Sequence, residues 1–168
     1  THPQLARPLH HLHKLMVQEC LQGHIRDSWD SIDYILYNQQ KIEVDGQGSK
    51  GFQPSIFNDE IRGNLQFVLR RELTPDEQNL LQTRYLHLSP KQLQEMIDKL
   101  TVLHSGEMAA YYIMRYGFYE GHTPYRADPI ALAWLFGFKT LEEIVDVFEK
   151  DLYESLTSPF TQKSIQTK

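Results

Sequence analysis

The stretch that most constrains the fold of this chain is 105–137, SGEMAAYYIMRYGFYEGHTPYRADPIALAWLFG. It is too apolar for a surface loop and rich in aromatic residues. Placed at 100° intervals, the side chains of residues 107–119 are apolar or aromatic on nearly every side, and such a helix is buried on more than one face. We therefore predict that 107–119 is a central helix with the other helices packed around it.

Further helices are predicted from apolar residues spaced three and four apart. Leu5, Leu9 and Leu12 begin such a stripe, which ends before Gly23. The same spacing predicts helices over 26–42 and 55–73. Between them, the glycine-rich stretch 43–53 is predicted to be a loop that could hold a short hairpin at Asp45-Gly46.

Several helix starts are marked by capping residues. Thr74 and Ser89 each precede a proline and stand three residues before a glutamate or glutamine, which is the pattern of a capping box. Asp128, followed by Pro129, predicts a short helix that Gly137 ends. Thr140 opens another capping box at the start of an amphipathic helix.

No stretch alternates convincingly with the period of two that a half-buried strand requires. The predicted fold class is therefore all-α: a single-domain bundle of about eight helices joined by short loops. We expect the domain to span 1–158, and the polar segment 159–168 to be a flexible tail.

Composition excludes several function classes. The chain has 168 residues and a formal net charge of -5, which argues against a nucleic-acid partner. A single cysteine, Cys20, allows neither an internal disulfide nor a multi-cysteine zinc site, and it suits a reducing compartment. No run approaches the ~20 apolar residues of a membrane span. We expect a soluble cytoplasmic protein.

The candidate site is the charged bend behind the central helix. Anion binding through its two arginines, or proton transfer between its histidine and a carboxylate, are the chemistries that this composition allows. The alternative is structural, with Asp128 capping a helix and the arginines paired with acids across an irregular turn. The candidate catalytic residues are Glu107, Glu120 and His122, and the candidate ligand-binding residues are Arg115, Tyr119, Tyr125, Arg126 and Asp128.

Other motifs are weaker. His10 and His13 lie one helical turn apart, but no repeated two-histidine signature accompanies them, so we predict no metal site. The glycines of 46–51 match G-x-G-x-x-G by letter but lack the surrounding βαβ unit, so no cofactor is predicted. The helices around Gly137 resemble a helix-turn-helix only in outline, because acidic residues would face the DNA phosphates.

The leading functional hypothesis is a helical protein-binding module, regulatory, adaptor or inhibitor-like, that docks a macromolecular partner. Asp27, Asp30 and Asp33 form either a solvated acidic edge or a patch that meets a basic protein. The alternative is an enzyme or small-ligand-binding protein whose anion-binding pocket is formed by 107–128. The sequence predicts no oligomeric state.

Overall fold

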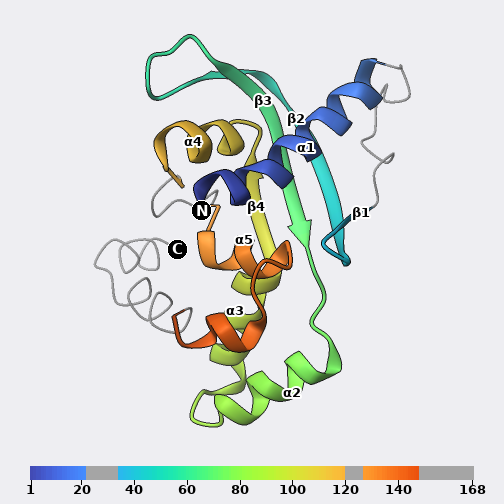
Figure 1. Ribbon diagram of the computed structural model, residues 1–168, viewed down its shortest axis with the longest axis vertical. Coiled ribbons are helices and arrows are strands. Elements are labelled where there is room, and N and C mark those ends of the chain that lie inside the picture. The colour runs from blue at the N-terminus through green and yellow to red at the C-terminus, as the bar shows by residue number, and fades with distance from the viewer. Residues whose placement is uncertain (22–33, 120–126, 148–168) are drawn as a thin grey trace, which may run out of the picture.

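The computed structural model of the protein describes residues 1–21, 34–119 and 127–147 (Figure 1). In this part of the chain, helices flank one antiparallel sheet of four strands in the order β1-β2-β3-β4. The strands are β1 (Tyr34–Tyr37), β2 (Gln40–Pro54), β3 (Arg62–Arg70) and β4 (Val102–Gly106). The helices are α1 (His2–Leu21), α2 (Pro75–Arg84), α3 (Pro90–Thr101), α4 (Ala109–Tyr116) and α5 (Pro129–Leu135), and residues 141–147 are also helical. The fold is therefore mixed α and β, and the prediction of an all-α helical bundle is wrong.

The β1–β2 hairpin replaces the end of the helix predicted over 26–42. Tyr37 pairs with Gln40 across a two-residue turn, where Asn38 and Gln39 have φ angles of 44° and 65°. Positive φ at both positions matches the right-handed twist of the two strands. Asp45-Gly46, where a hairpin was expected, lies inside β2 and pairs with Val68 and Phe67 of β3. Residues 26–33, including the acidic edge of Asp27, Asp30 and Asp33, lie outside the described residues.

The β2–β3 hairpin occupies the regions predicted as a glycine-rich loop and as a helix over 55–73. The whole of the predicted loop, 43–53, falls within β2, and the second half of the predicted helix falls on β3, so both predictions are wrong. Pairing between the two strands shifts register between Gly48 and Gln53, which marks a bulge. The turn over 55–61 joins the strands.

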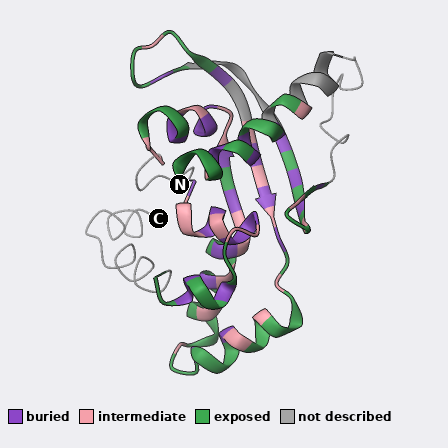
Figure 2. Cartoon of the chain, in the orientation of Figure 1, coloured by how far each residue is buried: buried purple, intermediate pink, exposed green. Residues whose placement is uncertain are grey.

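The core lies on one face of the sheet. Buried and exposed residues alternate along the strands, as Figure 2 shows, because successive side chains point to opposite faces. Helices α1 and α5 cross this face (Figure 1). The sheet residues of the core share one hydrophobic cluster with both helices: Ile35, Ile42, Val44, Phe67, Leu69 and Leu103 with Leu9 and Leu12 of α1 and Ala131, Leu132, Trp134 and Leu135 of α5. The sheet, and not a helix, forms the centre of the fold.

Helix α4 has one buried face. It lies beside α1 and is shorter than the predicted 107–119. Ala109, Ala110, Tyr112 and Ile113 are buried, whereas Met114, Arg115 and Tyr116 are exposed. The prediction that this helix is central is therefore wrong, although the prediction that a helix exists here is confirmed.

The capped helix starts are confirmed. Thr74 and Ser89 both form complete capping boxes with the residue three positions on. Asp128 accepts hydrogen bonds from the backbone N–H groups of Ile130 and Ala131 at the start of α5. Thr140 and Glu143 exchange the expected side-chain-to-backbone contacts. The predicted tail, 159–168, lies outside the described residues, and within those that are described no helix is long and apolar enough to cross a membrane.

Candidate functional site

Four of the candidate site residues, Glu120, His122, Tyr125 and Arg126, lie outside the described part of the chain. The other four contact different parts of the fold. Glu107 lies next to β3, with its Oε2 3.2 Å from the position that a Cβ on Gly63 would take. Arg115 is exposed on α4, and Asp128 caps α5.

Tyr119 contacts the beginning of α1. Its hydroxyl lies 2.7 Å from Nδ1 of His2, and the two rings are 5.6 Å apart. Burial raises the pKa of the Tyr119 hydroxyl. The contact joins the segment that follows α4 to the first residue of α1, so the role of Tyr119 here is packing.

A carboxylate that the sequence did not single out holds α4 to the β2–β3 turn. Oδ2 of Asp59 accepts hydrogen bonds from the hydroxyls of Tyr111 (2.7 Å) and Tyr116 (3.0 Å). Since Asp59 belongs to the turn and both tyrosines belong to α4, these bonds join segments far apart in the sequence. We call this group of three residues the Asp59 clamp.

The turn itself has a defined conformation. Asn58 and Glu60 have positive φ angles of 55° and 63°, a region that asparagine tolerates better than most residues. The N–H of Ser55 donates to the carbonyl of Ile61 over 2.8 Å and closes the turn. The N–H of Ile56 donates to the hydroxyl of Tyr112 over 3.3 Å, which adds a second tie to α4.

Phe57, at the tip of this turn, lies in an aromatic cluster. Its ring stacks on that of Tyr116, with centroids 3.9 Å apart and planes 23° apart. Tyr112 and Phe118 meet it edge-on at 5.4 Å and 5.6 Å. Both arrangements are favoured for aromatic pairs.

This region exposes large apolar side chains. The exposed fractions are 67% for Ile56, 37% for Phe57, 40% for Ile61 and 40% for Tyr116. We call these four residues the aromatic patch. The Asp59 clamp and the stack tie the turn to α4, so the patch is both exposed and anchored to a helix.

The electrostatics of the clamp do not suit proton transfer at neutral pH. Partial desolvation acts to raise the pKa of Asp59, but the hydroxyls of Tyr111, Ser55 and Tyr116 together lower it to about 2. The hydrogen bond that the Tyr111 hydroxyl donates to Asp59 is the main cause that raises the pKa of Tyr111. A general acid or base works best with a pKa near the operating pH. The clamp is therefore a fixed structural anion with two fixed donors.

Arg115 adds a positive charge beside the patch. Its guanidinium carbon lies 5.8 Å from the centroid of the Tyr116 ring. The hydroxyls of Tyr116 and, after it, Tyr111 are the main causes that raise the pKa of Arg115, so the guanidinium stays positively charged. Of the candidate residues that are described, Arg115 is the one beside the aromatic patch.

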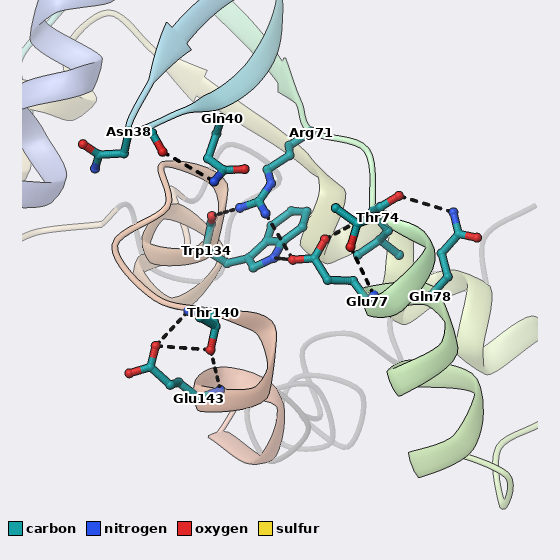
Figure 3. Close-up of polar contacts among 10 residues, drawn as sticks. Asn38, Gln40, Arg71, Thr74, Glu77, Gln78, Trp134, Thr140 and Glu143 are labelled. Atoms are coloured by element: carbon teal, nitrogen blue, oxygen red, sulfur yellow. Dashed lines mark hydrogen bonds and ion pairs between the residues drawn. The ribbon is translucent and has the colours of Figure 1, made fainter.

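A second polar cluster is buried and structural. Figure 3 shows Arg71, Glu77 and Trp134 directed toward one another between the end of β3, the first turn of α2 and α5. Oε1 of Glu77 accepts from Nη2 of Arg71 (3.1 Å) and from Nε1 of Trp134 (2.7 Å). Arg71 also donates to the carbonyl of Trp134, and its guanidinium lies 4.0 Å from the Trp134 ring centroid. Burial lowers the pKa of Arg71, and the charge of Glu77 opposes that shift.

The described residues include no group of three or more histidines, cysteines or acids that could hold a metal ion. His10 lies within α1, and nothing is described of the side chain of His13. Neither Asp59 nor Phe57 is among the candidate site residues, because both fall in the stretch 55–73 that is predicted to be a helix with Phe57 facing inward. The consecutive turn-forming residues Asn58 and Asp59 were the signal that could have located the turn.

Comparison of the chain with known protein families, curated proteins and solved structures finds no match. The function must therefore be argued from the geometry of its own residues.

Proposed function

We propose that this protein is a protein-binding module that docks a macromolecular partner through the aromatic patch of Ile56, Phe57, Ile61 and Tyr116. The observation that carries the proposal is the Phe57–Tyr116 stack, which is partly exposed although it is firmly held. Large aromatic side chains supply much of the binding energy of protein interfaces.

Rigidity makes such a patch effective. Binding normally costs free energy because mobile side chains and loops become ordered at the interface. The hydroxyls of Tyr111 and Tyr116 hold Asp59, and the hydroxyl of Tyr112 holds the backbone of Ile56. A partner would therefore meet a surface that is already ordered.

The described candidate residues favour docking over the alternative of an anion-binding or catalytic pocket in 107–128. Asp128 is engaged as a helix cap and Tyr119 in packing against His2, while the Asp59 clamp has pKa values far from neutrality. The net charge of -5 supports a protein partner over a nucleic acid. The single cysteine suits work in the reducing cytoplasm, where we propose that docking takes place.

The test uses a photoreactive amino acid, benzoylphenylalanine, placed either at Ile56 in the patch or at Leu86. Leu86 follows α2 and is 83% exposed, so it is a matched apolar control on another surface. Irradiation in cells should give a discrete protein adduct from position 56, and no such adduct from position 86. The proposal fails if position 56 yields no adduct or if both positions yield the same one.

A further inference from the structure

The rim of the aromatic patch carries charges of both signs. Glu60 and Arg62 are exposed on either side of Ile61, and Arg115 is exposed next to Tyr116. With Asp59, the part of the rim that the structure describes includes two acids and two bases. We infer that the partner on this patch is a second copy of the same chain, in a two-fold symmetric dimer. This inference rests on the proposed docking role of the patch.

Charge complementarity favours a second copy over other proteins. A strongly basic partner would face Arg62 and Arg115, and a strongly acidic one would face Asp59 and Glu60. In a two-fold interface, residue i of one copy meets residue j of the other, and j meets i. A patch with equal numbers of acids and bases can therefore pair each acid with a base of the other copy, although the whole chain has a net charge of -5.

The size of the patch is sufficient for a weak dimer. Its four residues expose the equivalent of nearly two complete side chains, about 370 Å² at roughly 200 Å² for a large side chain. Two copies that covered these residues completely would bury at most about 740 Å² of their surface, most of it apolar. Apolar surface makes up about 57% of the area of an ordinary interface. The whole interface would therefore bury about 1,300 Å², which is at the lower end for specific complexes. We therefore expect a dissociation constant in the micromolar range.

The open face of the sheet is a poorer candidate for this role. It exposes Tyr34 and Leu36 of β1, but Lys41, Glu43 and Asp45 of the neighbouring β2 are exposed there as well. Such a mixture is typical of the solvated face of an antiparallel sheet. The aromatic patch, in contrast, is built around the Phe57–Tyr116 stack, with Arg115 over the Tyr116 ring and Glu60 and Arg62 next to Ile61 in the sequence.

The first experiment measures the mass of the full chain by sedimentation equilibrium between about 1 µM and about 500 µM, a range that brackets micromolar dissociation. Wild type and Leu86→Asp should pass from monomer to dimer as the concentration rises, and Ile56→Asp should remain a monomer. The inference is overturned if wild type is a monomer throughout, or if Ile56→Asp dimerises as well as wild type does.

The second experiment reverses charges at the rim. We infer that Glu60 of one copy faces Arg115 of the other. Glu60→Arg and Arg115→Glu should then each weaken dimerisation at least about tenfold, because each places like charges opposite one another. An equimolar mixture of the two variants should form a heterodimer of nearly wild-type affinity, since every pair is then opposite in sign. Failure of the mixture to associate would overturn the two-fold arrangement. An adduct from position 56 with a different protein, together with a monomeric wild type, would refute the dimer and leave the proposed docking function standing.

Discussion

Replacing Glu77 with glutamine should destabilise the fold more than any change of similar size on the surface. Oε1 of Glu77 accepts from Arg71 and Trp134, and Oε2 accepts from the backbone N–H of Thr74 at 2.9 Å (Figure 3). A glutamine has one acceptor oxygen, so its amide nitrogen must face a donor on one side. The substitution also removes the negative charge opposite a buried arginine.

The magnitude follows from how deeply the pair is buried. The exposed fractions of the Arg71 and Glu77 side chains are 9% and 16%, so the guanidinium left behind cannot be fully rehydrated. Removing one partner of a buried ion pair costs about 3–5 kcal/mol. Because Arg71 keeps the carbonyl and the ring of Trp134, we expect the low end, about 3 kcal/mol. For a chain of this length, that corresponds to a fall in Tm of about 6–12 °C.

Thermal and denaturant unfolding, followed by circular dichroism, measure this loss. Gln78→Ala is the matched control, because Gln78 is exposed and makes one long side-chain hydrogen bond to the carbonyl of Leu73, at 3.4 Å. It should change the free energy of unfolding by less than about 0.5 kcal/mol. In the double variant Arg71→Met/Glu77→Gln the orphaned charge is gone, so the total cost should be less than the sum of the single costs. A Tm of Glu77→Gln within about 2 °C of wild type, or strict additivity in the double variant, would refute the reasoning.

Three further predictions concern the turns and caps. Gly137→Ala should lower the free energy of unfolding, measured by denaturant titration, by about 1–3 kcal/mol, because Gly137 has φ +69° and a Cβ there would lie 2.9 Å from Cγ of Gln40. Gly106→Ala is the control. Because the space around its new Cβ is open, this substitution should be neutral or stabilising in the same titration. The depressed pKa of Asp59, about 2, means that its carboxylate contributes stability above about pH 4 that is lost as the pH falls toward 2. The difference in free energy of unfolding between wild type and Asp59→Asn should therefore shrink across that window, and a difference that stays constant would contradict the clamp. Ser89→Ala should cost about 1 kcal/mol in denaturant unfolding, since it removes the capping box of α3.

The helix starts could be predicted from the sequence because capping is local chemistry. Thr74 and Ser89 need only the next three residues to satisfy the exposed N–H groups of a helix, and no distant contact competes with them. Gly137 likewise ends α5 through its own positive φ. These predictions of helix ends are confirmed because the residues that signal each end also make the contacts that form it, within one helical turn.

The strands could not be predicted in the same way because their partners are distant. Ile42 and Val44 alternate with Glu43 and Asp45, but four residues of alternation also fit other patterns. The turn before them, Asn38-Gln39, lacks the glycine that usually marks a two-residue hairpin. Farther along, Phe57, Ile61, Leu65 and Val68 happen to be spaced as on a helix. What decides between the two structures is pairing with β4, more than thirty residues later in the chain.

The candidate site could be predicted only in part, because it too depends on a partner that lies far away in the sequence. The aromatic and charged residues of 105–128 drew attention to Arg115 and the tyrosines, but their partner, Asp59, comes from another hairpin. A helix placed centrally would have buried its tyrosines, and each buried hydroxyl would have needed a partner inside the core. In the structure the sheet occupies the centre and α4 lies at the periphery. Tyr111 and Tyr116 therefore bind the carboxylate of Asp59 near the surface. The same shift that refutes the bundle therefore creates the exposed, rigid patch on which the docking proposal depends.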